Sequence, residues 1–197
     1  AKGIRILTGS AVIEARGSKH VTAARVAAID VKGHKVTSPG EWLECDLVAS
    51  SGGYSPVVHL ASHLGGKPIW REDILGFVPG EAPQKRVCVG GINGVYGLGD
   101  SLADGFEGGV RAASEAGFGP VEATLPKALT RLEEPTLALF QVPHEKNTAR
   151  APKQFVDLQN DVTAAAIELA TREGFESVEH VKRYTALGFG TDQGKLG

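Results

Sequence analysis

Methionine is absent from this chain of 197 residues, and cysteine occurs twice. Without methionine there is no initiator residue, and residues 4–7 (IRIL) have the pattern of a strand. We therefore expect an internal piece of a longer polypeptide. Cys45 and Cys88 stand beside hydrophobic residues, which is typical of buried, reduced thiols in a cytosolic protein. Two cysteines cannot supply four thiolate ligands, so we expect neither a zinc site of that kind nor an iron–sulfur cluster.

Long apolar runs and an excess of one charge are also missing. No hydrophobic run approaches the roughly 20 residues that a membrane-spanning helix needs. The net charge is -2, so the chain offers no basic surface for nucleic acid. With 42% hydrophobic residues, the composition is that of an ordinary globular chain, and we expect neither a membrane nor a nucleic acid among its partners.

The first third of the chain has the pattern of strands. Residues 4–14 and 20–30 alternate apolar and polar side chains around Gly17, and a turn at residues 38–40 precedes a short return strand. Residues 45–49 (CDLVA) are followed by small residues and glycines, which is typical of a parallel strand buried in an α/β sheet. Residues 57–64 have a helical pattern.

A second strand-to-helix pattern follows. Residues 86–89 predict a strand and residues 101–116 a helix with one apolar stripe. The turn between them contains Gly90, Gly91, Asn93 and Gly94, and it has the form of a nucleotide site because the free amides of a helix N-terminus attract phosphate. Glycines in such a turn also occur for backbone geometry alone. The spacing leaves dinucleotide binding and a simple turn both open.

The remainder divides into a connector and a helical module. Residues 119–153 contain five prolines and predict an extended connector, with one helical turn near residues 125–132. Thr163 and Ser177 are placed to cap two short helices, which end near Gly174 and Gly188. We assign residues 154–197 to a small all-α module made of these helices and the loop that follows them.

That loop is the strongest candidate for a binding site. It contains Thr191, Asp192, Gln193, Gly194 and Lys195. Glycine-rich loops present backbone N–H groups and a lysine to a phosphate or to the edge of a flavin. No Ser/His/Asp set and no facing pair of carboxylates stands out elsewhere, so we assign no catalytic residue and no metal ligand.

Residues 45–66 (CDLVASSGGYSPVVHLASHLGG) and 87–113 (VCVGGINGVYGLGDSLADGFEGGVRAA) resemble flavin-dependent proteins of the disulfide-reductase type. The resemblance implies an α/β fold in which residues 1–118 form the C-terminal half of a two-dinucleotide-binding, Rossmann-like domain of the FAD/NAD(P) type. In that family a Gly-Asp pair ends the strand, and its carboxylate contacts FAD. The matching residues here are Gly91 and Ile92, and the later pair Gly99 and Asp100 is the alternative.

Residues 144–163 (HEKNTARAPKQFVDLQNDVT) and 173–195 (EGFESVEHVKRYTALGFGTDQGK) resemble the alpha subunits of heterotetrameric sarcosine oxidases, and the likeness covers essentially the whole chain. It implies NAD in the alpha subunit, FAD in the beta subunit, FMN at the alpha–beta interface and a tetrahydrofolate site outside these residues. Beta, gamma and delta subunits would be the partners, in the cytoplasm. The enzyme would demethylate sarcosine to glycine with hydrogen peroxide as a product and pass the one-carbon unit to tetrahydrofolate. The chain alone would be inactive.

Residues 154–197 also resemble the helical iron–sulfur module of amine and opine dehydrogenase subunits. The cluster cysteines of that module correspond here to Asp157, Gln159, Asp192 and Gly197, which implies a cluster-free version. By resemblance the loop from Gly188 to Lys195 faces FMN, and docking of another subunit is the alternative role. Two rival functions also stay open: the alpha subunit of an amine or proline (opine-type) dehydrogenase, and a non-catalytic scaffold that assembles the complex.

Overall fold

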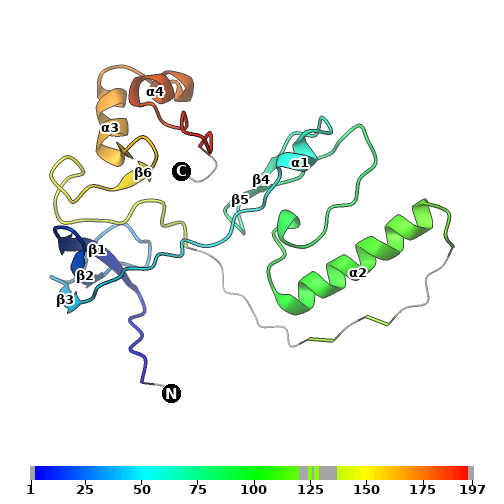
Figure 1. Cartoon of the computed structure of the whole chain (residues 1–197), viewed down its shortest axis with the longest axis horizontal. Helices are drawn as coiled ribbons and strands as arrows, with labels where there is room; N and C mark the ends of the chain where they lie inside the picture. Colours follow the sequence, from blue (N-terminus) through cyan, green and yellow to red (C-terminus); the bar gives the residue numbers. More distant parts are fainter. Residues whose placement is uncertain (1–2, 120–123, 126, 129–136, 195–197) are drawn as a thin grey trace. The chain divides into compact units, whose positions relative to one another are not determined.

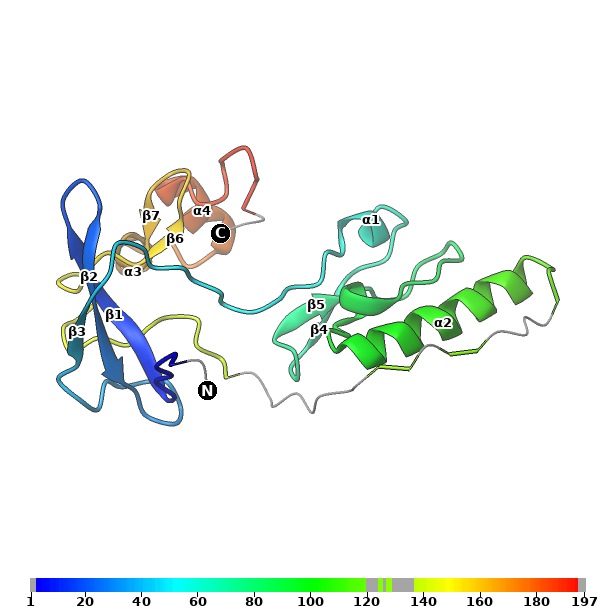
Figure 2. The same cartoon turned by 60° about the horizontal axis from the view of Figure 1, so that its bottom comes forward.

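The computed structural model describes residues 3–119, 124–125, 127–128 and 137–194, and the chain divides into two compact units. The first unit combines Ala1–Ala49 with Ala138–Gly197, and the second is Ser50–Leu137. Strands β1 to β3 and helices α3 and α4 belong to the first unit, whereas the second contains the long helix α2 (Figures 1 and 2). The expected helical turn near residues 125–132 lies largely outside the described residues.

The first unit contains an antiparallel sheet in the order β1-β2-β3. Its strands are β1 (Ser10–Gly17), β2 (Val21–Ala28) and β3 (Glu41–Glu44). The predicted hairpin around Gly17 and the return strand are therefore confirmed, although β1 begins at Ser10 and not at residue 4. Ala23 and Ala24 are both buried, and neighbouring residues of a strand point to opposite faces. The sheet is thus covered on both sides at this point.

Arg25 of β2 links this sheet to the segment after residue 137. Its side chain is 16% exposed, and its Nη2 donates to Glu145 Oε2 at 3.3 Å. Its Nε lies 3.4 Å from Glu14 Oε2 on β1. The guanidinium is mostly buried, whereas the Glu145 side chain is 44% exposed, so water screens this ion pair in part. Arg25 therefore helps to hold the predicted connector against the sheet within the first unit.

The rest of the first unit is a hairpin followed by two helices. Strands β6 (Phe155–Asp157) and β7 (Val162–Thr163) pair antiparallel, and α3 (Ala164–Arg172) and α4 (Val178–Thr185) follow. The prediction of an all-α module is therefore wrong, because strands of three and two residues are too short to show an alternating pattern. The cap at Thr163 is confirmed, since its Oγ1 accepts from Ala166 N at 3.2 Å.

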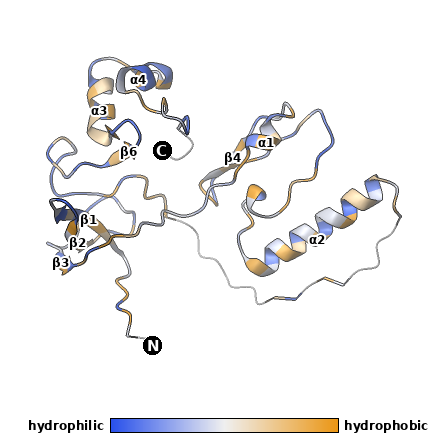
Figure 3. Ribbon diagram, in the orientation of Figure 1, coloured by the Kyte–Doolittle hydropathy of each residue, from blue (hydrophilic) through white to orange (hydrophobic). Residues whose placement is uncertain are grey.

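Helices α3 and α4 pack through a small set of residues. Ala170 is fully buried, and the rings of Phe175 and Tyr184 lie 4.7 Å apart. Tyr184 also donates its hydroxyl to Glu173 Oε2 at 2.6 Å. Val178, the first residue of α4, is 78% exposed. Figure 3 shows α4 as largely hydrophilic and α3 as more hydrophobic, as expected if α3 supplies more of the packed surface.

The second unit contains α1 (His59–Ser62), strands β4 (Ile69–Arg71) and β5 (Gly76–Val78), the 3₁₀ helix η1 (Gly90–Asn93) and α2 (Leu98–Glu115). Both predicted helices are confirmed, with α2 beginning three residues earlier than expected. Strands β4 and β5 form an antiparallel hairpin that the sequence pattern did not predict. The rings of Trp70 and Phe77 pack edge to face across it, with centroids 5.1 Å apart.

The two predicted parallel strands are wrong. Residues 45–49 and 86–89 form no strand, and every strand pairing among the described residues is antiparallel. Leu47, at the centre of the first run, is 75% exposed. A buried parallel strand needs neighbours that accept and donate its backbone hydrogen bonds. The described residues provide none for these runs, and the fold they show is mixed α/β.

Helix α2 packs on residues 87–89 through a glycine, and this contact generates a matched test. A Cβ added at Gly108 would lie 2.3 Å from Val89 Cγ1, whereas one added at Gly105 would meet nothing within 4 Å. Gly108→Ala should destabilise the protein by about 1–3 kcal/mol through overpacking. Gly105→Ala should stabilise it by roughly 0.8–1 kcal/mol through helix propensity.

Thermal denaturation followed by circular dichroism compares the two variants. The same substitution in one helix should move the melting temperature in opposite directions, by about 2–4 °C per kcal/mol for a protein of this size. Equal stabilisation by both alanines would show that α2 does not pack closely on residues 87–89.

Candidate functional site

The loop at residues 188–194 closes on itself between two glycines. Gly188 and Gly194 both have positive φ, of 73° and 77°, and a Cβ added at Gly194 would lie 3.2 Å from Gly188 Cα. Side chains at these positions would be strained and would separate the two ends. Gln193 also has a positive φ of 52°. The sequence therefore specifies a compact loop and not an open tail.

Asp157, at the end of β6, connects the hairpin to the start of this loop. It is 2% exposed, and its Oδ2 accepts from Gly188 N at 2.8 Å. Its Oδ1 accepts from Gln159 N at 2.9 Å and from Asn160 N at 3.0 Å. Hydrogen bonds from the Gly188 amide, and then from Asn160, hold the pKa of Asp157 below its usual range. The carboxylate is therefore ionised and fully bonded in the folded protein.

Gln159 connects the hairpin to the middle of the loop. Its Oε1 accepts from Thr191 N at 2.6 Å and from Thr191 Oγ1 at 3.0 Å. A Cβ added at Gly190 would lie 2.2 Å from Gln159 Oε1 and 2.9 Å from Gln159 Cβ, so glycine is required there for space. We call Asp157 and Gln159, with their bonds to Gly188 and Thr191, the latch.

Lys182 places a positive charge at the loop. Its Nζ lies 5.2 Å from the centroid of the Phe189 ring, a cation–π arrangement, and Phe189 is 58% exposed. The sequence pattern predicted this charge at Lys195, which lies outside the described residues. The signal that could have found it is a lysine in the last turn of α4, a few residues before an aromatic residue.

The other predicted loop residues lie close together in the structure. Several of their polar groups make hydrogen bonds within the protein. The amide and hydroxyl of Thr191 bind Gln159. Gln193 N donates to Gly190 O at 2.9 Å, and Gly194 N donates to Asp192 Oδ1 at 3.3 Å. These amides are therefore already donated within the protein. Outward the loop presents side chains, namely the exposed Gln193 and Phe189.

In the second unit, Gly90, Gly91, Asn93 and Gly94 form one tight turn around η1. Gly90 N donates to Asp104 Oδ2 of α2 at 2.6 Å, and Asn93 Nδ2 donates to Cys88 O at 2.6 Å. A phosphate at Gly90 would therefore meet a carboxylate. Asp104 was not singled out in the sequence, although it follows Asp100 by one helical turn.

Of the two candidate Gly-Asp positions, the later one stands at the start of a helix. Asp100 lies in the first turn of α2 and is exposed, whereas Ile92 lies within η1. A carboxylate in a first helical turn is favoured by the helix dipole. Beside this turn, the ring of Tyr96 packs on Gly91, and its hydroxyl is buried without a hydrogen-bond partner among the described residues. Burial raises the pKa of Tyr96.

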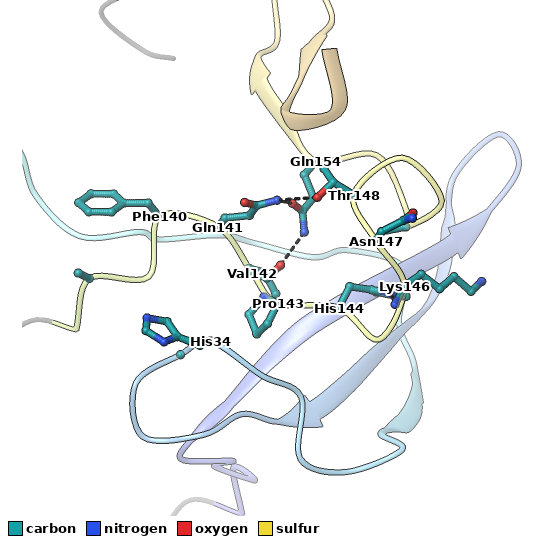
Figure 4. A pocket seen from close by; sticks show the side chains of 13 residues that line it. His34, Phe140, Gln141, Val142, Pro143, His144, Lys146, Asn147, Thr148 and Gln154 are labelled. Carbon is teal, nitrogen blue, oxygen red and sulfur yellow. Dashed lines mark hydrogen bonds between the residues drawn. The ribbon is translucent and has the colours of Figure 1, made fainter. Parts of the chain in front are cut away.

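A pocket of about 380 Å³ lies in the first unit, in a region predicted as connector (Figure 4). Gln141 Nε2 donates to Gln154 Oε1 at 2.8 Å, and Gln154 Nε2 donates to Val142 O at 2.6 Å. In Figure 4 the side chain of Lys146 extends away from these amides. Two of the amide side chains that line the pocket are thus bonded to each other and to the backbone. Its lining includes His34, Phe140, Gln141, His144, Asn147 and Gln154.

The part of the chain that the structure describes forms neither a cluster of metal ligands nor a membrane-spanning helix. No three His, Cys, Asp or Glu side chains there are grouped to hold a metal ion. No helix there is both long and apolar enough to cross a bilayer. Cys45 and Cys88 are free thiols, each partly exposed.

The fold resembles that of a protein from a known class, the oxidoreductases. The structure is similar to L-proline dehydrogenase from P. horikoshii, with a TM-score of 0.54 and 17% identity over 93% of this chain and 36% of that one. At this identity the match shows the fold alone, and that fold occurs in an oxidoreductase. Residues 151–197 match the family described as the sarcosine oxidase A3 domain.

Comparison of sequences gives matches of higher identity than the comparison of structures. The chain is 38% identical over 197 residues to sarcosine oxidase subunit alpha of Corynebacterium sp. (strain U-96) and 34% identical over 195 residues to that of strain P-1. Each match covers 98% of this chain and 20% of the relative. The subunit from Rhizobium meliloti (strain 1021) is 38% identical over 159 residues. The chain is a homologue of sarcosine oxidase subunit alpha, as its sequence predicted, and spans about a fifth of the length of these relatives.

The latch predicts a pH dependence. The folded pKa of Asp157 is lowered, so its stabilising contribution is complete above the unfolded value of about 3.9 and is lost as the pH falls through the folded value. Asp157→Asn replaces one carboxylate oxygen by an NH₂ group. This donor would then face the N–H groups that the oxygen accepted from, either Gly188 N or those of Gln159 and Asn160. We expect a melting temperature several degrees lower at neutral pH, and a difference from the unsubstituted protein that shrinks below about pH 3.9.

Asp161→Asn is the matched control. Asp161 lies in the same hairpin but is exposed, and its φ of 53° suits asparagine. Melting curves between neutral and acidic pH should leave this variant close to the unsubstituted protein. A constant difference for Asp157→Asn at all pH values would contradict the assignment of an ionised latch.

Proposed function

We propose that this chain is a segment of the alpha subunit of a heterotetrameric sarcosine oxidase, assembled with beta, gamma and delta subunits. The whole enzyme demethylates sarcosine to glycine, releases hydrogen peroxide and passes the one-carbon unit to tetrahydrofolate. The observation that carries this proposal is the match along 98% of the chain to proteins named sarcosine oxidase subunit alpha. We assign the sarcosine and folate sites to the rest of the enzyme, so that the chain alone is inactive.

The 188–194 loop is the part that we assign to the FMN at the alpha–beta interface. The fit rests on exposed side chains, because Phe189 offers a ring and Gln193 an amide. Lys182 adds a cation beside them. Bound FMN supplies the electron-transfer chemistry, and a nearby positive charge favours its anionic reduced form. Thr191, whose polar groups bind Gln159, serves in this proposal to hold the loop.

An NAD site is proposed in the second unit, at the start of α2. Carboxylates accept hydrogen bonds from ribose hydroxyls, and Asp100 and Asp104 stand one turn apart there. The unpartnered hydroxyl of Tyr96 supports a polar ligand beside Gly91, because buried polar groups normally have a partner. The Gly90 amide binds Asp104. We therefore assign sugar hydroxyls, and not the pyrophosphate, to this turn.

A second candidate is the alpha subunit of an amine or proline dehydrogenase, which the shared fold with L-proline dehydrogenase favours. An iron–sulfur cluster in the helical module would need thiolate ligands. Residues 138–197 contain no cysteine, so this segment does not fit such a cluster, and the oxidase is preferred. The FAD of the proposed enzyme is assigned to the beta subunit, outside this chain.

Co-expression of the full-length protein with its partner subunits tests the proposal. We expect hydrogen peroxide to form when sarcosine is added and glycine to accumulate in equal amount. Denaturing the protein should release NAD, which mass spectrometry then identifies. Assays for iron and acid-labile sulfide should remain at background. Proline-dependent dye reduction with stoichiometric iron would establish the dehydrogenase instead. An assembled complex that shows no activity and holds no nucleotide would indicate a non-catalytic scaffold.

A further inference from the structure

We infer that Gln159 is the positioning residue of the 188–194 loop, and that together with Asp157 it sets the loop's conformation before any ligand or partner arrives. Both residues belong to the β6–β7 hairpin, yet their bonds reach 31 and 32 residues along the chain. Such bonds fix the loop relative to the hairpin, which local turn geometry cannot do. The role of this conformation toward FMN rests on the proposed function.

Two acceptors and one steric contact define the conformation. Asp157 holds the first residue of the loop, through Gly188 N, and Gln159 holds the fourth, through both the amide and the hydroxyl of Thr191. Gly190 packs so closely on Gln159 that a methyl group cannot enter between them. Phe189 and Gly190 lie between these fixed points, so the backbone that carries the exposed Phe189 ring is held at both ends.

The same arrangement exposes a second apolar side chain. Leu158 stands between the two latch residues, in the turn that follows β6, and is 78% exposed. Leu158 and Phe189 are therefore each held one residue from a latch bond. A preformed element of this kind loses less conformational entropy on binding than a flexible loop. In this inference the latch raises the affinity of the loop for its ligand and shapes the surroundings of the flavin. It does so through the loop, because the latch residues themselves do not contact the flavin.

Three substitutions test the inference. Gln159→Ala removes the acceptor, Gln159→Glu keeps an acceptor oxygen in the same place, and Gly190→Ala displaces the Gln159 side chain by steric overlap. Gln84→Ala, at an exposed glutamine of the second unit, is the matched control. In the full-length protein before assembly, hydrogen exchange is measured by mass spectrometry on peptides that cover residues 188–194. In the assembled enzyme, the absorbance spectrum and reduction potential of the flavin are recorded.

We expect Gln159→Ala and Gly190→Ala to accelerate exchange in the loop by about fivefold or more, the effect of losing a hydrogen bond. Gln159→Glu and Gln84→Ala should leave it within about twofold. The first two variants should also shift the flavin spectrum or potential, and Gln159→Glu should restore the exchange protection. Unchanged exchange in Gln159→Ala would overturn the positioning role, whatever the flavin does. Faster exchange with an unaltered flavin would support the latch and overturn the assignment of this loop to FMN.

Discussion

A carboxylate shielded from water must be surrounded by hydrogen-bond donors, and Asp157 is the residue on which the rest of the helical segment depends. Four N–H groups meet it: the backbone amides of Gln159, Asn160 and Gly188 and the side-chain amide of Asn160. Three of these belong to its own hairpin, and the fourth comes from the loop. Satisfying this one charge therefore shapes the hairpin and joins it to the segment that we assign to the flavin.

Close approach between backbone and side chain recurs in both units, and glycine makes it possible. Gly190 admits the Gln159 side chain in the first unit, and Gly108 admits Val87 and Val89 in the second. Neither of these glycines is required by a positive φ. Their value lies in the absence of a Cβ, which lets a loop or a helix come near enough for the latch bonds or for packing.

Features that depend on neighbouring residues could be predicted from the sequence, and those that depend on distant ones could not. The first hairpin, the cap at Thr163 and helix α2 each follow from local spacing. The runs at residues 45–49 and 86–89 have the composition of strands, but strands form only where partners exist. The candidate loop was identified, and Asp157 and Gln159 were named only as the positions of lost cluster cysteines. Their hydrogen bonds to the loop were not predicted, because a bond that spans 31 residues leaves no periodic trace. Asp104 was overlooked because its bond to Gly90 joins a helix to the turn before it, and such a contact shows in no sequence pattern.

The atoms that hold the loop are oxygen and nitrogen throughout. Residues 138–197 contain neither cysteine nor methionine, so this stretch has no sulfur atom. Sulfur side chains are the ones that oxidants convert most readily, thiols to sulfenic acids and thioethers to sulfoxides. The enzyme that we propose releases hydrogen peroxide, and its flavin environment would meet that oxidant at every turnover. A loop fastened by a carboxylate and an amide offers it no sulfur to attack, and so would keep its shape through repeated catalytic cycles.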